Sequence, residues 1–271
     1  MNELSQQSNN QSLIPVHVQL EYQNLTDADI QHVIDEQIIE KQCTSLNLSG
    51  NQITHKGVTM LANILKNNKA LKELYLGGNN IGAVGMQYLA DTLATNTTLT
   101  KLDLSQNQIG DTGLEYLSNG LRNNTTLTTL NLFSNQIGPS GAQHLAHAMR
   151  NKTTLKILYL SENGIGFSGA QHLGDALKIN TTLTTLDLYG NHIQAVGAKH
   201  LAESLRKNSA LHTLDLQYNK IGDKGVQHLA HVLHDNKILT ALSLQYNEIG
   251  TAGAHDLADA LRNNTVTYIF F

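Results

Sequence analysis

A period of 28 residues dominates this chain of 271 residues. Eight successive units follow one another without insertion or deletion, and their first positions are Cys43, Leu71, Leu99, Leu127, Leu155, Leu183, Leu211 and Leu239. Counted from that residue, every unit has Asn at position 9, Ile at position 11, Gly at position 15 and Leu at position 19. Such self-similarity predicts a repeat architecture, in which one short structural unit is stacked many times.

The pattern inside one unit predicts a short strand followed by a helix. Leu102 and Leu104, at positions 4 and 6, alternate with polar residues, which is typical of a strand with one buried face. Apolar or small residues then recur at helical spacing, at positions 16, 19, 20 and 23, as in Leu114, Leu117, Ser118 and Leu121. We expect Asn at position 9 to bond its own turn and the next unit, and Asn at position 26 to form the left-handed turn that ends a helix.

The full pattern, L-x-x-L-x-L-x-x-N-x-I-G-x-x-G, runs through residues 43–265 and resembles the ribonuclease-inhibitor-like class of leucine-rich repeats. The resemblance implies an α/β solenoid, a curved horseshoe with parallel strands on the concave side and helices on the convex side. The even repeats and the Asn, Thr and Gln content also resemble the repeat domains of NOD-like receptors and the leucine-rich-repeat effectors that intracellular bacteria deliver into host cells. These resemblances imply a protein that binds another protein.

The ends of the chain depart from the repeat. We expect residues 1–12 to be a disordered tail and residues 13–42 to form an N-terminal cap, with Val16, Val18 and Leu20 in a strand and Thr26 capping a helix that runs to Ile38. Residues 266–271 match the start of a ninth unit. An uncovered ninth strand would lie at the edge of the sheet, where it predicts possible self-association.

Composition excludes several other classes of protein. The net charge of −4 and the spread of only 18 Lys and Arg along the chain argue against a nucleic-acid partner, and no apolar run is long enough to insert in a membrane. Cys43 is the single cysteine, it occupies a core leucine position, and it can form no intramolecular disulfide. The polar residues 1–12 also lack the features of a signal peptide. We therefore expect a cytoplasmic protein, or a host-cytoplasmic one if the chain is a secreted effector.

The motifs that suggest catalysis have simpler explanations. Gly164, Gly166 and Gly169 spell G-x-G-x-x-G, but Gly166 and Gly169 are the ordinary repeat glycines at positions 12 and 15. Asp187 and Asp215 should lie on adjacent strands at the spacing of a glycosidase pair, although on an open surface. The histidines at position 18, His144, His172, His200 and His228, should lie on successive helices, too far apart to share one ion. We predict no catalytic residue, no cofactor and no metal site.

Some proteins of the resembled class activate GTPases through an arginine near a strand-to-helix loop. Here Arg122, Arg150, Arg206 and Arg262 all fall at position 24, near the predicted helix ends. This placement disfavours an activator, which stays an alternative.

The outward positions of the strands suggest where a partner binds. Positions 3, 5, 7, 8 and 10 should face the concave side or its rim. Six of the 13 Tyr and Phe residues of the chain lie at these positions, interleaved with acidic residues. Because tyrosine is enriched among binding hot spots, we predict a protein or peptide partner here, the alternative being aromatic packing between units. The predicted site comprises Tyr75, Asp103, Phe133, Tyr159, Glu162, Asp187, Tyr189, His192, Asp215, Tyr218, Tyr246 and Glu248.

Overall fold

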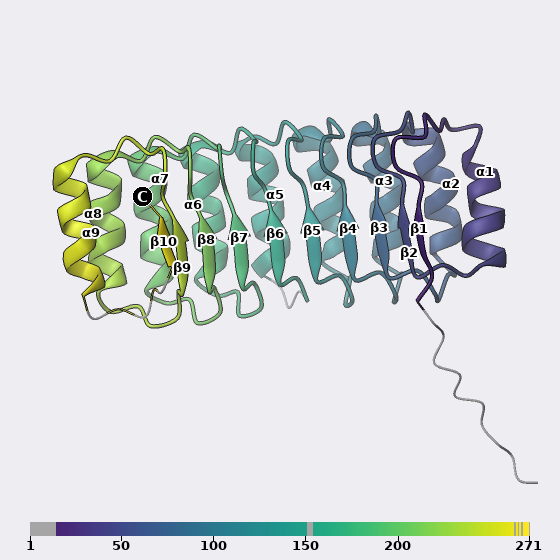
Figure 1. Ribbon diagram of the computed structural model, residues 1–271. Helices are drawn as coiled ribbons and strands as arrows, with labels where there is room; N and C mark the ends of the chain where they lie inside the picture. The colour runs from purple at the N-terminus through teal and green to yellow at the C-terminus, as the bar shows by residue number, and fades with distance from the viewer. Residues whose placement is uncertain (1–14, 151–153, 263, 265, 267, 271) are drawn as a thin grey trace, which may run out of the picture.

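The computed structural model describes residues 15–150, 154–262, 264, 266 and 268–270, and these form an α/β solenoid (Figure 1). Ten parallel strands form one sheet in chain order. The strands are β1 (His17–Gln19), β2 (Ser45–Asn47), β3 (Glu73–Tyr75), β4 (Lys101–Asp103), β5 (Thr129–Asn131), β6 (Ile157–Tyr159), β7 (Thr185–Asp187), β8 (Thr213–Asp215), β9 (Ala241–Ser243) and β10 (Tyr268–Phe270). The α/β solenoid predicted from the period is confirmed.

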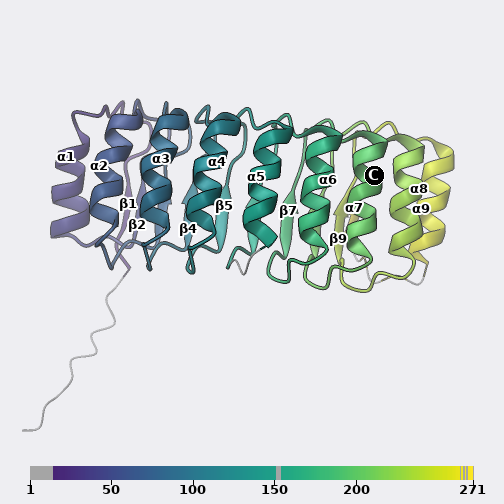
Figure 2. The ribbon, with the colours of Figure 1, turned by 180° about the vertical axis from the view of Figure 1, so that it is seen from behind.

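The helices form a second layer that covers one face of the sheet (Figure 2). They are α1 (Ile30–Val33), continued by the π-helix η1 (Ile34–Glu40), then α2 (His55–Leu65), α3 (Gly82–Leu93), α4 (Gly110–Leu121), α5 (Pro139–Arg150), α6 (Gly166–Leu177), α7 (Gln194–Leu205), α8 (Gly222–Leu233) and α9 (Thr251–Leu261). No helix in the described part of the chain has the length and hydropathy to cross a bilayer.

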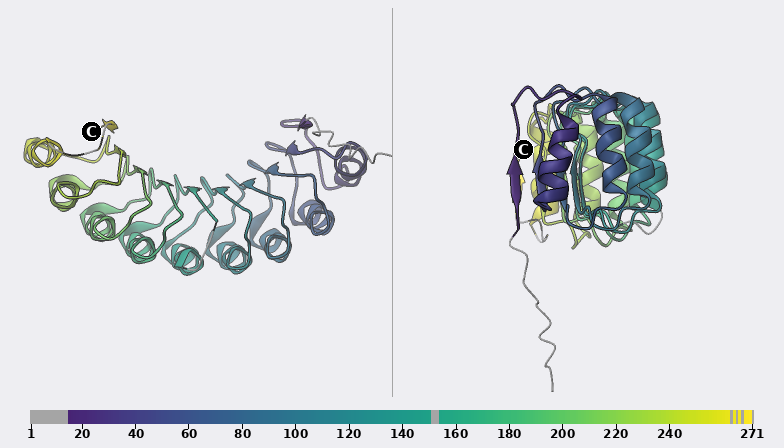
Figure 3. Two further views of the ribbon diagram at one scale, coloured as in Figure 1. Left: turned by 90° about the horizontal axis from the view of Figure 1, so that it is seen from below. Right: turned by 90° about the vertical axis from the view of Figure 1, so that its right-hand side faces the viewer.

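The solenoid is an arc with the strands on its inner side and the helices on its outer side (Figure 3). Neighbouring strands lie about 4.8 Å apart, whereas packed helices need about 8–10 Å, so the stack bends towards the strands. The glycine at position 15 lets each helix approach the previous one. A Cβ atom on Gly113 would lie 2.5 Å from Ile109 Cγ2 and 3.1 Å from the Cα atom of Ala83, so a larger residue would push these units apart.

The core lies between the two layers and continues through all units. Leu102 of β4 is directly paired with Leu130 of β5, and the helix residues Leu114, Leu117 and Leu121 are buried beneath the strands. Because each unit buries its leucines only against its neighbours, stacking supplies the stability that one unit of 28 residues lacks.

The asparagine at position 9 connects two consecutive units: it bonds its own turn, as the sequence predicted, but reaches the preceding unit rather than the next one. Asn135 Nδ2 donates to the carbonyl oxygens of Leu104 and Phe133, at 2.8 and 3.2 Å. Its Oδ1 accepts from the backbone N–H groups of Asn107 and Ile109, at 3.0 and 3.3 Å. The amide is buried and fully used, so the ladder satisfies backbone groups that the short strands leave unpaired.

The prediction for the asparagine at position 26 was wrong. These residues do not adopt positive φ; they form a second buried ladder below the strands. Asn180 Nδ2 donates to the Met149 carbonyl of the preceding unit at 2.8 Å, and its Oδ1 accepts from the N–H groups of Thr182 and Leu183. The left-handed residues lie instead after the strands, at position 8 of every unit and at many of positions 10 and 12.

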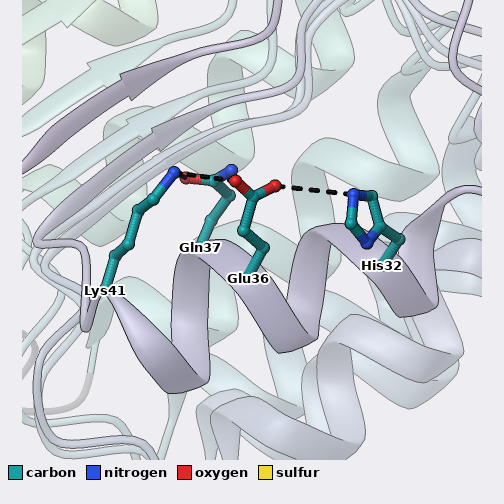
Figure 4. Close-up of polar contacts among 4 residues, drawn as sticks. All are labelled: His32, Glu36, Gln37 and Lys41. Atoms are coloured by element: carbon teal, nitrogen blue, oxygen red, sulfur yellow. Dashed lines mark hydrogen bonds and ion pairs between the residues drawn. The ribbon is translucent and has the colours of Figure 1, made fainter.

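The N-terminal cap differs from its prediction in how the helix begins. Asp29 precedes α1 and accepts from both the backbone N–H and the hydroxyl of Thr26, so Thr26 does not cap the helix. The helix then widens into η1, whose surface carries a chain of polar contacts (Figure 4). Glu36 lies between His32, at 3.5 Å, and Lys41, at 2.9 Å, and Lys41 also donates to Gln37. Residues 1–12, predicted to be disordered, lie outside the described residues.

Helices begin in two different ways along the solenoid. At most units a residue with positive φ stands at position 12, for example Gly82 at φ +61° and Gln194 at φ +59°. At three units the residue at position 12 does not have positive φ. There the carboxylate of an aspartate in the preceding unit accepts a hydrogen bond from a backbone N–H group at the start of the helix. Asp27 accepts from Thr54 N, Asp111 from Gly138 N and Asp223 from Gly250 N, at 2.6–2.8 Å.

The last strand, β10, pairs with β9 and ends the sheet. Ile269 is opposite Leu242, and the ring of Tyr268 is 64% exposed. Strand β1 ends the sheet on the other side, so both outer strands have an unpaired edge among the described residues.

Candidate functional site

The predicted site residues all lie on the strands or in the loops that follow them. Tyr75, Asp103, Tyr159, Asp187 and Asp215 are the last residues of their strands. Phe133, Glu162, Tyr189, His192, Tyr218, Tyr246 and Glu248 lie in the loops between strand and helix. These loops form the upper margin of the ribbon in Figure 1, above the arrowheads of the strands.

Three tyrosines of units 6, 7 and 8 form a continuous aromatic ladder. The ring centroids of Tyr189 and Tyr218 are 5.1 Å apart with an interplanar angle of 60°, and those of Tyr218 and Tyr246 are 4.3 Å apart at 21°. The spacing of Tyr218 and Tyr246 follows from the sheet, because both stand at position 8 and neighbouring strands bring equivalent residues about 4.8 Å apart. Tyr189 stands at position 7, and its ring is tilted against that of Tyr218. We call Tyr189, Tyr218 and Tyr246 the aromatic ladder.

The aromatic ladder is exposed to an increasing degree along the chain. Tyr189 is half-buried, Tyr218 is 45% exposed and Tyr246 is 68% exposed. Partial burial and the adjacent rings raise the pKa of the Tyr218 hydroxyl, first by desolvation and then through Tyr246 and Tyr189. The rings therefore support one another and still offer a surface, so packing between units accounts for only part of their contacts.

Two aspartates lie on the strands below the aromatic ladder. Asp187 of β7 is directly paired with Asp215 of β8. Desolvation, with the charge of Asp187 as a weaker cause, raises the pKa of the Asp215 carboxyl, although the N–H and side-chain amide of Gln217 donate to it. Asp187 accepts from the Ser161 hydroxyl and from Tyr189 N, which ties this carboxylate to the first tyrosine of the ladder.

Two further acidic residues and one histidine border this region in the loops. Glu162, His192 and Glu248 are exposed and all adopt positive φ, near 53–58°. The Glu162 carboxyl lies beside Gly190, where a Cβ atom would meet it at 3.1 Å. Units 5 to 8 thus combine aromatic rings with carboxylates on one margin.

The remaining predicted residues do not join this cluster. The Tyr75 hydroxyl donates to Glu73 at 2.9 Å, and the Lys101 ammonium lies 4.8 Å from the centre of the Tyr75 ring. That contact with Tyr75 raises the pKa of Lys101. Tyr75 lies on β3, far along the sheet from β7 (Figure 1), and is occupied by its own neighbours. Phe133 and Asp103 are half-buried between the two regions.

The residues considered for catalysis have structural surroundings. Gly166 adopts φ +63° where α6 begins, and a Cβ atom on Gly169 would collide with Ile165. Cys43 is buried, and desolvation raises the pKa of its thiol to about 11. Among the described residues no group of three His, Cys, Asp or Glu side chains has the arrangement of a metal site.

Sequence reasoning missed one aromatic residue of the same type. Tyr22 is 77% exposed and adopts φ 56°, as do Tyr218 and Tyr246. Counted back by the 28-residue period, Tyr22 occupies the same position as both. Extending the register into the N-terminal cap would have found it, but the cap has too few of the repeat's leucines to suggest that register.

Comparison with known proteins agrees with the repeat geometry. The family model described as "Leucine Rich repeat" matches residues 44–62, 67–90, 95–118, 123–146, 151–174, 180–202, 207–230 and 235–258. The chain belongs to the leucine-rich-repeat family. Proteins built from such repeats generally mediate protein–protein interactions.

No curated protein sequence matches this leucine-rich-repeat protein. Among solved structures, it is similar to "Leiomodin-1 Actin-Binding Site 2 (ABS2)". The likeness has 24% sequence identity and a TM-score of 0.40, and it covers 44% of this chain and 69% of that chain. It carries no argument about what this leucine-rich-repeat protein binds.

Proposed function

We propose that this leucine-rich-repeat protein is a non-enzymatic interaction module that binds a protein or peptide on its concave, aromatic and acidic surface. The observation that carries the proposal is the aromatic ladder, whose rings are in mutual contact, held by the sheet and partly exposed. Rigid tyrosines supply contact area at low cost in conformational entropy and are enriched among hot spots.

The charges around the aromatic ladder indicate the chemistry of the partner. Asp187, Asp215, Glu162 and Glu248 surround the rings with carboxylates, so the partner should present Lys or Arg beside apolar side chains. A guanidinium group can pair with a carboxylate and also stack on a tyrosine face, which favours arginine.

The repeat itself supplies substitutions that test the proposal. Other units carry Ser105 and Gln106 at the positions of Tyr189 and Tyr218, with Gln106 at the same positive φ. The triple variant Tyr189→Ser, Tyr218→Gln, Tyr246→Gln should therefore fold normally. A displayed peptide library selected on the unaltered chain should be enriched in arginine and apolar residues, and the selected peptides should bind the variant at least about tenfold more weakly.

A matched control separates this surface from tyrosine loss in general. Tyr88 is 43% exposed on α3, and the equivalent residue of α5 is His144, so Tyr88→His should leave peptide binding unchanged. The double variant Tyr189→Ala, Tyr218→Ala should likewise lose a partner captured from a eukaryotic lysate. Unchanged binding by the folded triple variant would show that the ladder is not the binding surface.

The finer assignment follows from resemblance. The proposal includes the ribonuclease-inhibitor-like class, an effector acting on a host protein, and a cytoplasmic location, in the host cell if the chain is secreted. The insertion-free repeats and the single buried cysteine support these points. Locating a tagged chain in producing cells and in host cells would test them.

The alternative function, activation of a GTPase, has less support. Arg122, Arg206 and Arg262 cap the C-terminal ends of α4, α7 and α9, and Arg150 ends α5. These arginines lie at the opposite margin from the aromatic ladder, where none can reach a partner held by the tyrosines. A GTP turnover assay with captured GTPases should show no stimulation.

A further inference from the structure

The cationic side chains gather at one margin of the solenoid, although the sequence suggested that they are spread along the chain. Among the described lysines and arginines, only Lys56, Lys199, Lys220 and Lys224 lie on helix starts, in a helix middle or in the loops before helices. The others lie at helix ends, in the loops after helices or at strand starts. This margin is the lower one in Figure 1, and we call it the basic edge.

Two groups of residues make up the basic edge. The helix ends supply Lys66, Arg122, Arg150, Lys178, Arg206 and Arg262. The loops and strand starts add Lys41, Lys69, Lys72, Lys156, Lys207 and Lys237, all exposed, and the half-buried Lys101.

The helix dipole explains the first group only. Cations at helix C-termini are favoured by the partial negative charge there. Lys69, Lys72 and Lys156 belong to no helix, so a dipole gives no reason for them. Lys178 and Arg262 pair with Asp175 and Asp259 one turn earlier.

Several of the cations have no charged partner. Arg122 and Arg206 form no ion pair with any described residue, and Arg150 interacts with Asp175 only at longer range. The acidic groups on the same edge are fewer than the cations, and they are Glu36, Glu40, Glu73, Asp91, Asp175, Glu203, Asp235 and Asp259. Exposed cations that are not neutralised by the protein itself leave a positive potential over the whole edge, which suits an anionic partner.

The N-terminal end of the basic edge is hollowed. A cavity of about 660 Å³ lies between β1, the end of η1 and the start of β3. Its lining includes the cationic Lys41, Lys69 and Lys72 and also His17, together with the two acidic residues Glu40 and Glu73. An anionic group of the size of a phosphate could be surrounded there by several ammonium groups at once.

Two exposed isoleucines lie among these cations. Ile39 is 51% exposed and Ile179 is 59% exposed, and both occupy the same position of the repeat. Other units have Asn67 or Asn123 there. Lys178 directly precedes Ile179, and Lys41 follows Ile39 by two residues. Apolar side chains between cations are typical of proteins that lie on a membrane surface.

We propose that the basic edge docks this protein on an anionic lipid bilayer. The arc in Figure 3 carries cations both on its outer side, at the helix ends, and on its inner side, at the strand starts. A flat bilayer contacts both sides together, whereas a straight nucleic-acid duplex meets only part of the arc. The isoleucines also gain nothing from a phosphate backbone but can enter the headgroup region.

The test measures binding of the full chain to vesicles by flotation. Vesicles of phosphatidylcholine with about 30% phosphatidylserine should bind the chain at low salt, binding should weaken as salt rises, and vesicles of phosphatidylcholine alone should not bind it. Arg122→Gln, Arg150→Gln, Arg206→Gln together should weaken binding about a hundredfold, at about fivefold per cation.

A matched variant removes the same charge from other margins. Lys56→Gln, Lys220→Gln, Lys224→Gln should retain binding within about threefold, since these residues lie far from the basic edge. The variant Ile39→Asn, Ile179→Asn, with the residue that other units carry, should weaken vesicle binding but leave binding to a DNA oligonucleotide unaltered. Thermal melting of each variant verifies that it is folded.

Three results would overturn the proposal. The first is no flotation with phosphatidylserine vesicles at low salt. The second is an equal loss in both charge variants, which would indicate a general effect of net charge. The third is tighter binding of a DNA oligonucleotide than of the anionic vesicles. Since the aromatic ladder lies at the opposite margin, peptide binding should be unaffected by the arginine variant, which distinguishes this proposal from the proposed function.

Discussion

At the scale of single residues, buried amides hold the repeat together. Each asparagine at position 9 accepts from the N–H groups of the preceding unit and donates to carbonyls of that unit and its own, as Asn135 shows. A hydrogen bond of a buried amide contributes only modestly to the free energy of unfolding. A buried N–H or carbonyl group that loses its bonding partner, however, costs its full desolvation penalty. The side chain is therefore far more costly to remove than its net contribution suggests.

Replacing Asn135 by alanine should destabilise the protein strongly. The substitution leaves Asn107 N and Ile109 N without their side-chain partner, while the Leu104 carbonyl keeps the amide of Asn107. At about 1–3 kcal/mol for each of the two unsatisfied groups, the free energy of unfolding should fall by about 2 kcal/mol or more. Urea denaturation measures it, with Gln143→Ala on the exposed face of α5 as control. A loss below about 1 kcal/mol would show that water replaces the amide.

The raised pKa of Asp215 makes a prediction about pH. Folding disfavours the charged form of this carboxyl relative to the unfolded chain, because of desolvation and, more weakly, Asp187. The ionised form therefore costs stability above the folded pKa, and this cost shrinks as the pH falls below the folded pKa and is gone below the unfolded pKa. Asp215→Asn should raise the melting temperature at pH 7, with a difference that vanishes in acid. Asn131 occupies the same position of the repeat, so the amide fits. Equal melting curves at every pH would contradict this.

At the scale of elements, the loops after the helices depend on the second asparagine ladder. Asn124 and Asn180 each donate to a carbonyl of the preceding unit and accept from the N–H groups that begin the next strand. Unit 4 is the exception, since Lys152 stands where the others have asparagine. A small cavity lined by Leu121, Met149 and Leu155 lies at that unit.

Restoring the repeat residue should stabilise this element. In Lys152→Asn the amide can donate to the Leu121 carbonyl and accept from the N–H groups of Thr154 and Leu155, as in the other units. We expect a gain of about 1–2 kcal/mol, typical of a substitution towards the consensus of a repeat. Calorimetry compares it with Lys156→Asn, which removes the same charge without joining the ladder. A melting temperature no higher than that of this control would contradict the prediction.

The sequence predicted the elements well because the same physical pattern occurs eight times. The alternation of Leu102 and Leu104 and the helical spacing of Leu114 to Leu121 placed strand and helix correctly. It could not predict η1 or the role of Asp29, because the cap occurs once and has no second copy to compare. Asparagine at position 26 was misassigned because its tendency towards left-handed turns is local, whereas the burial that decides its role comes from the neighbouring unit.

The site could be predicted in part for the same reason. The period places Tyr189, Tyr218 and Tyr246 on neighbouring units, and the structure adds that their rings touch, tilted between Tyr189 and Tyr218 and stacked between Tyr218 and Tyr246. The sequence could not reveal that Tyr75 is occupied by Glu73 and Lys101, since those contacts depend on side-chain conformation. The period placed the arginines of the basic edge at the helix ends, but it did not reveal that the lysines of the loops and strand starts lie on the same margin, since these occupy different positions of the repeat.

At the scale of the whole molecule, the parallel sheet has two open ends. Each unit is covered by its neighbours, but β1 and β10 have none on their outer sides among the described residues. An unpaired strand edge can pair with another chain, and two different ends that join head to tail generate open assemblies. The two outer strands therefore predict head-to-tail self-association.

We expect the chain to self-associate through β10 as its concentration rises. Light scattering over a concentration series should show increasing mass, and Tyr268→Lys should reduce it, because an edge lysine disfavours strand pairing. Tyr88→Lys, at an exposed tyrosine on α3 away from both ends of the sheet, is the control for added charge. A constant monomeric mass for the unaltered chain would show that the outer strand is protected.

The aspartates that cap the helix of the following repeat restrict which repeats can be neighbours in the stack. Because Asp27, Asp111 and Asp223 each complete the helix of the following repeat, that repeat carries a start of a different shape and cannot follow an arbitrary predecessor. Duplication or deletion of single repeats would separate such couples. A change in the number of repeats, by evolution or by engineering, should therefore add or remove two repeats together: the one that carries the aspartate and the one whose helix it caps.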